Sequence, residues 1–383
     1  MRGRFLLVLV LFACGAPAPA MGQVGGAPTT SQRTGEQIYR ATCVACHGVD
    51  GKGQKQALIG FEPPDSFPDF TDCPVASSEP DSIWNAVIHR GGRVRGLSHI
   101  MPAFEDALTD PEIDSLVQYL HAFCAEPRWP RGNLNFPRTF FTEKAFPENE
   151  TVLSLDVVPS HPRSLSPRVG YERRFGRRAQ VELVAPFTFE QGPRVAGSGG
   201  GGGWSKGLGD VTAAFKYALF DSYERGSIFS AGGEVKLPTG KETEGLGGGV
   251  TVLEAFALYG QALPRDAFVQ AHVGFESPTN REIEPQAAFW RAAIGRTFTP
   301  TRFGRIWTPM VEVLGARELE KGSKIQWDVV PQMQVSLNVF QHIRFNVGVR
   351  LPVTERQTRN TALLTYVLWD WADGGLFDLW RAN

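Results

Sequence analysis

The chain has 383 residues, of which 42% are hydrophobic and 21% are charged, with 39 basic against 40 acidic residues. This nearly neutral composition lacks the excess positive charge with which nucleic-acid-binding proteins neutralise phosphates, so we expect no nucleic-acid partner. The average conceals a division: residues 21–125 carry seven Lys and Arg against 13 Asp and Glu, whereas residues 126–383 carry 30 against 27. An acidic N-terminal part favours a basic partner, although it is equally compatible with an ordinary solvated surface.

The N-terminus has the features of a secretory signal. An apolar run, residues 5–13, is followed by small residues that end in Ala18-Pro19-Ala20. We therefore expect residues 1–20 to be a signal peptide, and the run is too short to span a bilayer. Lipoprotein processing at Cys14 is the alternative. In both cases we expect export to a compartment in which disulfides persist.

Residues 43–47 read Cys-Val-Ala-Cys-His. Two thiols three positions apart can each add to a vinyl group of one haem, and the adjacent histidine then ligates the iron. The same spacing could form a strained disulfide or half of a zinc site, but zinc would need a second ligand pair that the sequence lacks. We therefore expect one covalent haem c on Cys43 and Cys46, with His47 as proximal ligand.

A second axial ligand is expected in the loop before the last helix of this region. Met101 lies there, directly before Pro102. A thioether ligand raises the reduction potential of the iron, and the proline stiffens the loop that presents it. The rival ligands are His99 and His89, and a purely packing role is the alternative for Met101.

Two further cysteines, Cys73 and Cys124, remain after this assignment. In an oxidising compartment we expect a disulfide between them that ties a loop to the last helix. Two free buried thiols are the alternative.

Short helices are expected between residues 34 and 124. Capping boxes begin at Thr34 and Thr109, and apolar residues at helical spacing follow each of them. A further helix is expected from Asp81 to the glycines at 91 and 92. A haem would supply the apolar surface that these helices need to cover.

The haem motif, the His-Ile-Met-Pro-Ala-Phe loop at 99–104 and the Leu-Thr-Asp-Pro-Glu-Ile helix start at 108–113 together resemble a class I cytochrome c. The resemblance covers residues 34–124. It implies an all-α domain with a single haem c held by His47 and Met101, and electron transfer as the activity.

Beyond this domain the periodicity changes. Residues 125–150, rich in Pro, Arg and Phe, are predicted to be a linker packed at a domain edge, and period-two alternation follows them. The alternation predicts twelve strands, near residues 151–158, 166–173, 177–189, 208–220, 226–237, 250–260, 266–275, 286–298, 305–315, 327–339, 342–351 and 360–371.

The connections between these strands alternate between short and long, which is the habit of outer-membrane barrels. Charged residues also share one phase of the alternation, as a polar lumen requires: Glu182, Lys216, Glu234, Lys236, Glu312, Arg344 and Arg350. We therefore predict that residues 151–383 form an antiparallel outer-membrane β-barrel of about twelve strands. A soluble sandwich with an aromatic core is the alternative.

Segments such as 209–211 and 233–240 resemble a family of Gram-negative outer-membrane channels named for a phenol-degradation pathway. That resemblance implies a barrel and is compatible with a pore. The arrangement as a whole also resembles the fused cytochrome-porins of iron-oxidising bacteria, which have a larger barrel and a smaller haem segment.

The leading hypothesis is an electron carrier: one haem c, anchored in outer-membrane lipid by the barrel, that faces the periplasm and meets a basic redox partner there. With an even strand count, both barrel ends lie on one side of the membrane, and a lumen of twelve strands is too narrow for a packed domain. The first alternative is a channel whose haem domain senses redox state or gates. The second is an oxidoreductase with an unrecognised site in the β domain. The oligomeric state is left open.

Overall fold

The computed structural model describes residues 32–54, 60, 62, 67–124, 129–160, 162–191, 203–339 and 341–370. The expected signal peptide, its cleavage site and Cys14 lie outside the described residues. The chain from Thr34 onward forms one compact unit. Among the helices described, none combines the length and the apolar character that a bilayer span demands.

The N-terminal part of this unit is a small helical region. No strand occurs among its described residues up to position 124. Both expected capping boxes are present, one between Thr34 and Gln37 and one between Thr109 and Glu112. Its elements are α1 (Gly35–Ile38), η1 (Tyr39–Cys43), α2 (Val44–His47), α4 (Cys73–Ser78), α5 (Asp81–Arg90), η2 (Gly92–Arg95) and α6 (Asp110–Ala122).

The first and last helices of this region, α1 and α6, pack in close contact because α1 begins with a glycine. A Cβ atom on Gly35 would lie 2.1 Å from the carbonyl oxygen of Ser115, so no other residue fits without movement. The Gly35 N–H donates to the Ser115 hydroxyl at 2.8 Å. Around this crossing lies a core that includes Ile38, Ile113 and Leu116.

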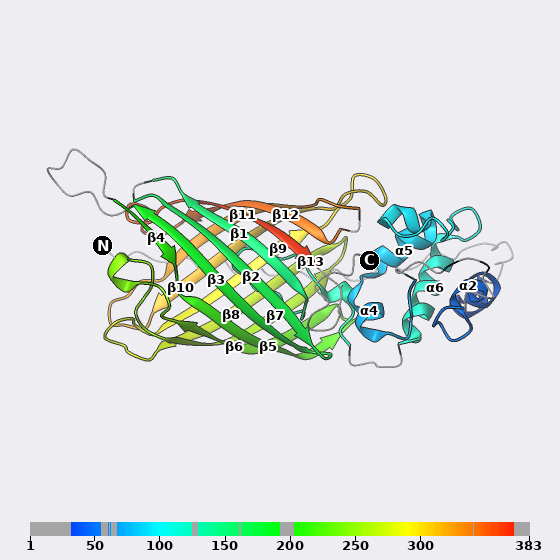
Figure 1. Ribbon diagram of the computed structural model, residues 1–383, viewed down its shortest axis with the longest axis horizontal. Coiled ribbons are helices and arrows are strands. Elements are labelled where there is room, and N and C mark those ends of the chain that lie inside the picture. Colours follow the sequence, from blue (N-terminus) through cyan, green and yellow to red (C-terminus); the bar gives the residue numbers. More distant parts are fainter. Residues whose placement is uncertain are drawn as a thin grey trace, which may run out of the picture. The chain divides into compact units, whose positions relative to one another are not determined.

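The C-terminal part is a closed antiparallel barrel (Figure 1). After η3 (Gly132–Leu134), its strands are β1 (Glu150–Val158), β2 (Ser164–Phe175), β3 (Ala179–Gln191), β4 (Trp204–Leu208), β5 (Val211–Ser222), β6 (Ser227–Leu237), β7 (Val252–Leu263), β8 (Ala267–Pro278), β9 (Ala287–Arg296), β10 (Trp307–Glu318), β11 (Gln326–Ser336), β12 (Ile343–Pro352) and β13 (Ala362–Asp370), and η4 (Glu242–Glu244) lies between β6 and β7. Each strand pairs with its neighbours in sequence, and β13 pairs with β1, which closes the ring.

The ring contains twelve strands although thirteen segments are labelled. The short segment β4 and the longer β5 both pair with β3, one on each half of its length, and only residues 209 and 210 separate them. They are therefore two parts of one strand. The prediction of twelve strands is confirmed, and each predicted run overlaps one strand of the ring.

The outer face of the barrel is apolar and exposed. Large hydrophobic side chains there remain more than a third accessible, among them Leu153, Val169, Leu183, Phe215, Leu253, Val273, Ile294, Val313, Val347 and Val367. The predicted inward phase holds, since Glu182 and Glu312 alternate with Leu183 and Val313. An exposed apolar surface of this extent around a whole barrel is unusual in a soluble protein and suits contact with lipid.

The segment predicted as a linker, residues 125–150, differs from that expectation over most of its described length. Arg131 and Gly132 lie against Tyr223 and Ser78, between the cytochrome domain and the barrel, but the chain from Leu134 onward enters the barrel lumen. Phe136 and Phe146 join a core with inward side chains of β5 to β8 and β10. Four phenylalanines lie between positions 136 and 146, too many for a solvated linker, and the lumen buries Phe136 and Phe146 and half-buries Phe140 and Phe141. We call residues 134–149 the plug.

Glu312 on β10 holds the centre of the plug. Its carboxylate is fully buried and accepts the backbone N–H groups of Phe140, Phe141 and Thr142 at 3.0, 3.1 and 2.6 Å. Gln332 on β11 donates to the same carboxylate at 2.7 Å. One buried charge is therefore matched by four donors, three of which belong to the plug.

Other strands bind the plug backbone through its carbonyl oxygens. Side chains of β6, β8, β9 and β13 donate to four of them: Ser230 to Ala145 at 2.5 Å, Gln270 to Pro137 at 2.9 Å, Arg291 to Phe141 at 2.9 Å and Tyr366 to Arg138 at 2.5 Å. Contacts on many sides of the ring fix the segment across the lumen.

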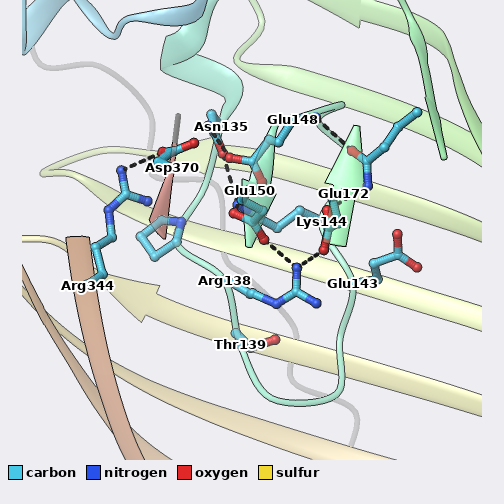
Figure 2. Close-up of polar contacts among 12 residues, drawn as sticks. Asn135, Arg138, Thr139, Glu143, Lys144, Glu148, Glu150, Glu172, Arg344 and Asp370 are labelled. Carbon is cyan, nitrogen blue, oxygen red and sulfur yellow. Dashed lines mark hydrogen bonds and ion pairs between the residues drawn. The ribbon is translucent and has the colours of Figure 1, made fainter. Parts of the chain in front are cut away.

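Two basic residues of the plug pair with carboxylates of β1 and β2 and with one carboxylate of the plug itself (Figure 2). Arg138 pairs with Glu150 on β1 and Glu172 on β2. Lys144 pairs with Glu148 and lies 3.1 Å from Glu150. Lys144 and the carboxylates are almost fully shielded from water, and Arg138 is 19% exposed. Removing one partner of such a pair leaves a buried charge unpaired, which costs about 3–5 kcal/mol.

Candidate functional site

The Cys-Val-Ala-Cys-His motif closes the first helical stretch of the chain. η1 delivers Cys43 in a π-helical turn, a feature often found at functional sites, and α2 carries Cys46 and His47. Gly48 then reverses the chain with φ of +74°, and the Gly53 N–H donates to the His47 carbonyl at 2.9 Å. The Tyr39 hydroxyl donates to the Gly48 carbonyl at 2.7 Å. Neither cysteine takes part in a disulfide.

Two glycines fix the loop that carries Met101. The Gly92 N–H donates to the Met101 carbonyl at 3.1 Å. A Cβ atom on Gly91, whose φ is +75°, would lie 2.7 Å from that same oxygen. The methionine loop can therefore lie directly against the end of α5, because these positions have no side chain.

One apolar cavity brings the motif and this loop together. Cys43 and His47 line it from one side of the sequence, and Met101 lines it from the other. The remaining lining residues are Thr42, Phe70, Ile88, Phe104, Leu116 and Leu120. The imidazole of His47 also stacks on Phe67 and Phe70, with ring centroids 5.0 and 4.9 Å apart.

The donor set of this cavity fits a haem. An imidazole and a thioether face one apolar space, as the axial ligands of a His/Met haem c do, and the Cys43 thiol also lines it. Cys46 follows in α2 and is not among the lining residues. Burial lowers the pKa of His47 to about 4, so the ring is neutral and able to ligate a metal at physiological pH. Its Nδ1 atom is buried without a hydrogen-bond partner among the described residues.

The two rival histidines lie elsewhere. His99 is exposed to solvent and does not line the cavity. His89 is buried, but its Nε2 atom lies 3.1 Å from Arg302 and 3.4 Å from Asp110. The geometry therefore favours Met101 over both.

Comparison with known proteins identifies the helical region. Residues 30–120 match the family described as cytochrome C oxidase, cbb3-type, subunit III. This region is a c-type cytochrome domain. The match covers the cytochrome domain and not the barrel, and no curated protein matches the chain.

Solved structures of barrel proteins are similar to the rest of the chain at low identity. The KdgM porin has 9% identity and a TM-score of 0.37, with 58% of this chain and 99% of that chain covered. The NanC porin has 6% identity and a TM-score of 0.40 over 58% and 99%. An outer membrane channel from Pseudomonas putida F1 has 12% identity and a TM-score of 0.40 over 62% and 100%. The barrel of this chain is itself defined by its strand pairing.

Cys73 and Cys124 form a disulfide in the cytochrome domain, with their Cα atoms 5.1 Å apart. The bond ties α4 to the end of α6 and closes a loop that contains Met101 and α5. This loop spans 51 residues, so the bond removes substantial conformational freedom from the unfolded chain.

Replacing both residues, Cys73→Ala with Cys124→Ala, is expected to lower the free energy of unfolding of the cytochrome domain by about 2–4 kcal/mol. Denaturant unfolding of the haem-loaded full chain, followed by haem absorption, measures this change. A double variant within about 0.5 kcal/mol of the wild type would contradict a structural role for the bond, because ordinary surface substitutions have effects of that size.

Contacts join the cytochrome domain to the end of the barrel that carries the shortest turns, 176–178, 223–226 and 264–266, and also the longer connection 297–306. Arg95 of η2 donates to the Phe303 carbonyl in the β9–β10 turn at 2.8 Å. The Tyr223 hydroxyl, in the β5–β6 turn, donates to Asp81 of α5 at 2.8 Å. His342, before β12, pairs with Glu79 at 3.1 Å. The barrel residues of these contacts, Phe303, Tyr223 and His342, were not predicted as contacts from the sequence, because each lies between strands in a segment without periodicity.

The pair between Glu79 and His342 is expected to make this contact depend on pH. Burial alone lowers the pKa of His342, but the charge of Glu79 outweighs it and raises the pKa to about 9. Burial likewise raises the pKa of Glu79, and His342 reverses that shift to a lowered value. The pair therefore stabilises the contact fully between about pH 4.5 and 6.5, loses strength as pH rises toward 9, and is also lost in acid.

A double-mutant cycle with Glu79→Gln and His342→Gln measures this effect. The expected coupling energy at pH 6 is on the order of 1 kcal/mol, since both side chains are partly exposed, and it should approach zero at pH 10. Equal coupling at the two pH values would exclude an ion pair.

Proposed function

We propose that this chain is an outer-membrane monohaem cytochrome that passes electrons at the periplasmic face. The observation that carries the proposal is the convergence of Cys43, His47 and Met101 on one apolar cavity in a c-type cytochrome domain. A haem bound there would supply a one-electron redox couple, with Cys43 and Cys46 as its covalent attachment. The imidazole and the thioether would hold the iron and favour its reduced state.

The chain's own residues would govern access to this couple. Apolar side chains of α5 and α6 exclude water from the cavity, which limits the reorganisation that electron transfer requires. Val49 and Ile100 are exposed, at 63% and 38%. Val49 follows the haem motif by two residues and Ile100 precedes Met101, so each offers an exposed apolar side chain against which a redox partner would dock. The net negative charge of residues 21–125 favours a partner with a basic surface.

The apolar belt of the barrel supports the membrane assignment. The cytochrome domain contacts the barrel end that carries the shortest turns, and in outer-membrane barrels the short turns lie on the periplasmic side. One haem at that face cannot alone carry electrons across roughly 30 Å of hydrocarbon. The proposal therefore places both the donor and the acceptor in the periplasm, and the barrel acts as the anchor.

A second candidate, a channel gated by the haem domain, is favoured by the plug. The plug follows the cytochrome domain in the chain, lies in the lumen and contacts strands around the ring. A redox-dependent movement of the domain would pull on the plug. Lumen conductance that changes with haem redox state, at constant pH, would favour this candidate over a simple anchor.

Cell fractionation followed by protease digestion tests the leading proposal. The protein should fractionate with the outer membrane and retain covalent haem in denaturing gels. The cytochrome domain should be cleaved only after the outer membrane is permeabilised. A fully soluble protein would exclude the membrane anchor, and cleavage in intact cells would exclude the periplasmic orientation.

A further inference from the structure

A row of carboxylates runs across neighbouring strands on the lumen side of the barrel, because the strand pairing places acidic residues opposite one another. Its lower part, which begins at the end of the barrel where β1 starts, comprises Asp370, Glu150, Glu172 and Glu182, each directly opposite the next on neighbouring strands. Glu182 lies opposite Ala214, and Ala214 lies opposite the next carboxylate, Glu234. The upper part comprises Glu234, Glu254 and Glu276, again directly opposite one another on β6, β7 and β8.

Because barrel strands are tilted, this row rises from one mouth to the other. Asp370 and Glu150 lie at strand ends beside the plug, whereas Glu254 and Glu276 lie two residues from the strand ends at the long-loop mouth. Opposed residues on neighbouring strands have Cβ atoms about 4.5–5.5 Å apart, and like charges there are destabilising. A repulsive row of this length requires compensation.

The lower part is compensated by the protein itself. Arg138 and Lys144 of the plug pair with its glutamates, and Arg344 lies 3.5 Å from Asp370. The carboxylates of Glu148, Glu150 and Asp370 are close enough to hold a metal ion, but these basic side chains already occupy their surroundings.

The upper part of the row differs in how its negative charge is compensated. No Lys or Arg forms an ion pair with Glu234, Glu254 or Glu276 among the residues that the structure describes. All three are partly accessible in the lumen. The nearest cations are Arg291 on β9, whose charge acts on all three glutamates, and Lys236, which pairs with Glu284. Three carboxylates opposite one another on adjacent strands therefore leave net negative charge at the long-loop end of the barrel.

A buried histidine points into this group. His272 on β8 is 3% exposed, and its Nε2 atom has no hydrogen-bond partner in the described part of the chain. Nε2 lies 3.9 Å from an oxygen of Glu254, too far for a direct hydrogen bond. Nδ1 accepts the N–H of Glu143 in the plug at 3.4 Å, so in the neutral ring Nε2 carries the hydrogen.

An occupant of this place must accept a hydrogen bond from His272 and donate hydrogen bonds to carboxylates. A water molecule has both properties, and a water held by a divalent cation donates more strongly. Hydrated Mg²⁺-like cations bind to carboxylates while keeping several of their waters. A dehydrated metal site is less suitable, because the ring nitrogen that faces the group bears hydrogen.

We propose that Glu234, Glu254 and Glu276, with His272, form a binding site in the lumen for a hydrated divalent cation of the Mg²⁺ or Mn²⁺ class. The site lies between the long-loop mouth and the plug. Together with Arg291 it compensates the upper part of the carboxylate row, as Arg138 and Lys144 compensate the lower part.

Mn²⁺ binding to the purified haem-loaded full chain in detergent, measured from the resonance of free Mn²⁺, tests the site. The wild type should bind Mn²⁺, and Mg²⁺ should displace it. The triple variant Glu234→Gln, Glu254→Gln and Glu276→Gln should bind at least tenfold more weakly. The matched control Glu242→Gln, Glu244→Gln and Glu282→Gln changes three exposed glutamates between strands at the same end and should bind as the wild type.

The triple variant is expected to fold, because glutamine has nearly the same volume as glutamate and removes the repulsion between opposed carboxylates. Weaker binding in this variant therefore reports on the site and not on misfolding. In metal-free buffer the triple variant should unfold at the wild-type temperature or above, and Mg²⁺ should raise the unfolding temperature of the wild type alone. Equal Mn²⁺ affinity of the wild type and the triple variant would overturn the proposal. So would a wild type that binds no Mn²⁺ at millimolar concentration.

Discussion

Replacing Glu312 with alanine is expected to open the barrel to ions. The wild-type carboxylate accepts three consecutive N–H groups of the plug, all inside the lumen. Removing it leaves these donors unpaired, at about 1–3 kcal/mol for each group. The plug should leave its place or admit water, and the conductance of single molecules in a planar bilayer should rise severalfold above that of the wild type.

Two control variants sharpen this prediction. Glu312→Gln keeps one acceptor oxygen and should show a smaller increase. Glu284→Ala, which removes a partner of Lys236 near the long-loop mouth and does not contact the plug, should conduct as the wild type. If Glu312→Ala folds into a barrel but conducts no more than the wild type, the carboxylate does not hold the plug in place.

Replacing Met101 with alanine is expected to cause the largest change in redox properties. The weak near-infrared band that arises from sulfur-to-iron ligation should disappear. The reduction potential should fall by on the order of 0.1 V or more, since the identity of the axial ligands spans about 0.8 V. Both changes follow from the loss of a soft ligand that favours ferrous iron.

The matched control for this variant is His99→Ala. His99 is exposed, two residues away in the same loop, and outside the cavity. This variant should retain the band and the potential of the wild type. An unchanged spectrum in Met101→Ala, or a lost band in His99→Ala, would refute the assignment of the axial ligand.

Regular elements of this chain are predictable from the sequence because their signals are local. The capping boxes at Thr34 and Thr109 each depend on two residues three positions apart. The twelve strands are recognised because apolar and polar side chains alternate along each of them. The inward phase of Lys216 and Glu312 follows from the same alternation. These predictions need no knowledge of which strands meet.

Features that depend on strand register or on residues far apart in the sequence could not be predicted from local sequence patterns. Glu234, Glu254 and Glu276 are twenty or more residues apart and meet only when three strands align, and a shift of one residue would turn them toward lipid. The plug has no periodicity. Its content of phenylalanine, at positions such as 136 and 146, was nevertheless a usable signal, because a solvated linker does not carry four large aromatic residues in so short a span.

The most direct test of the central claim is the side from which the haem accepts electrons. Intact expressing cells are mixed with a reduced basic redox protein too large to cross the outer membrane, and haem absorption is followed with time. We expect no reduction of the haem until the outer membrane is permeabilised, and rapid reduction of the haem afterwards. Full reduction in intact cells would contradict this expectation, as would a permeabilised sample whose haem is reduced by dithionite but by no protein donor.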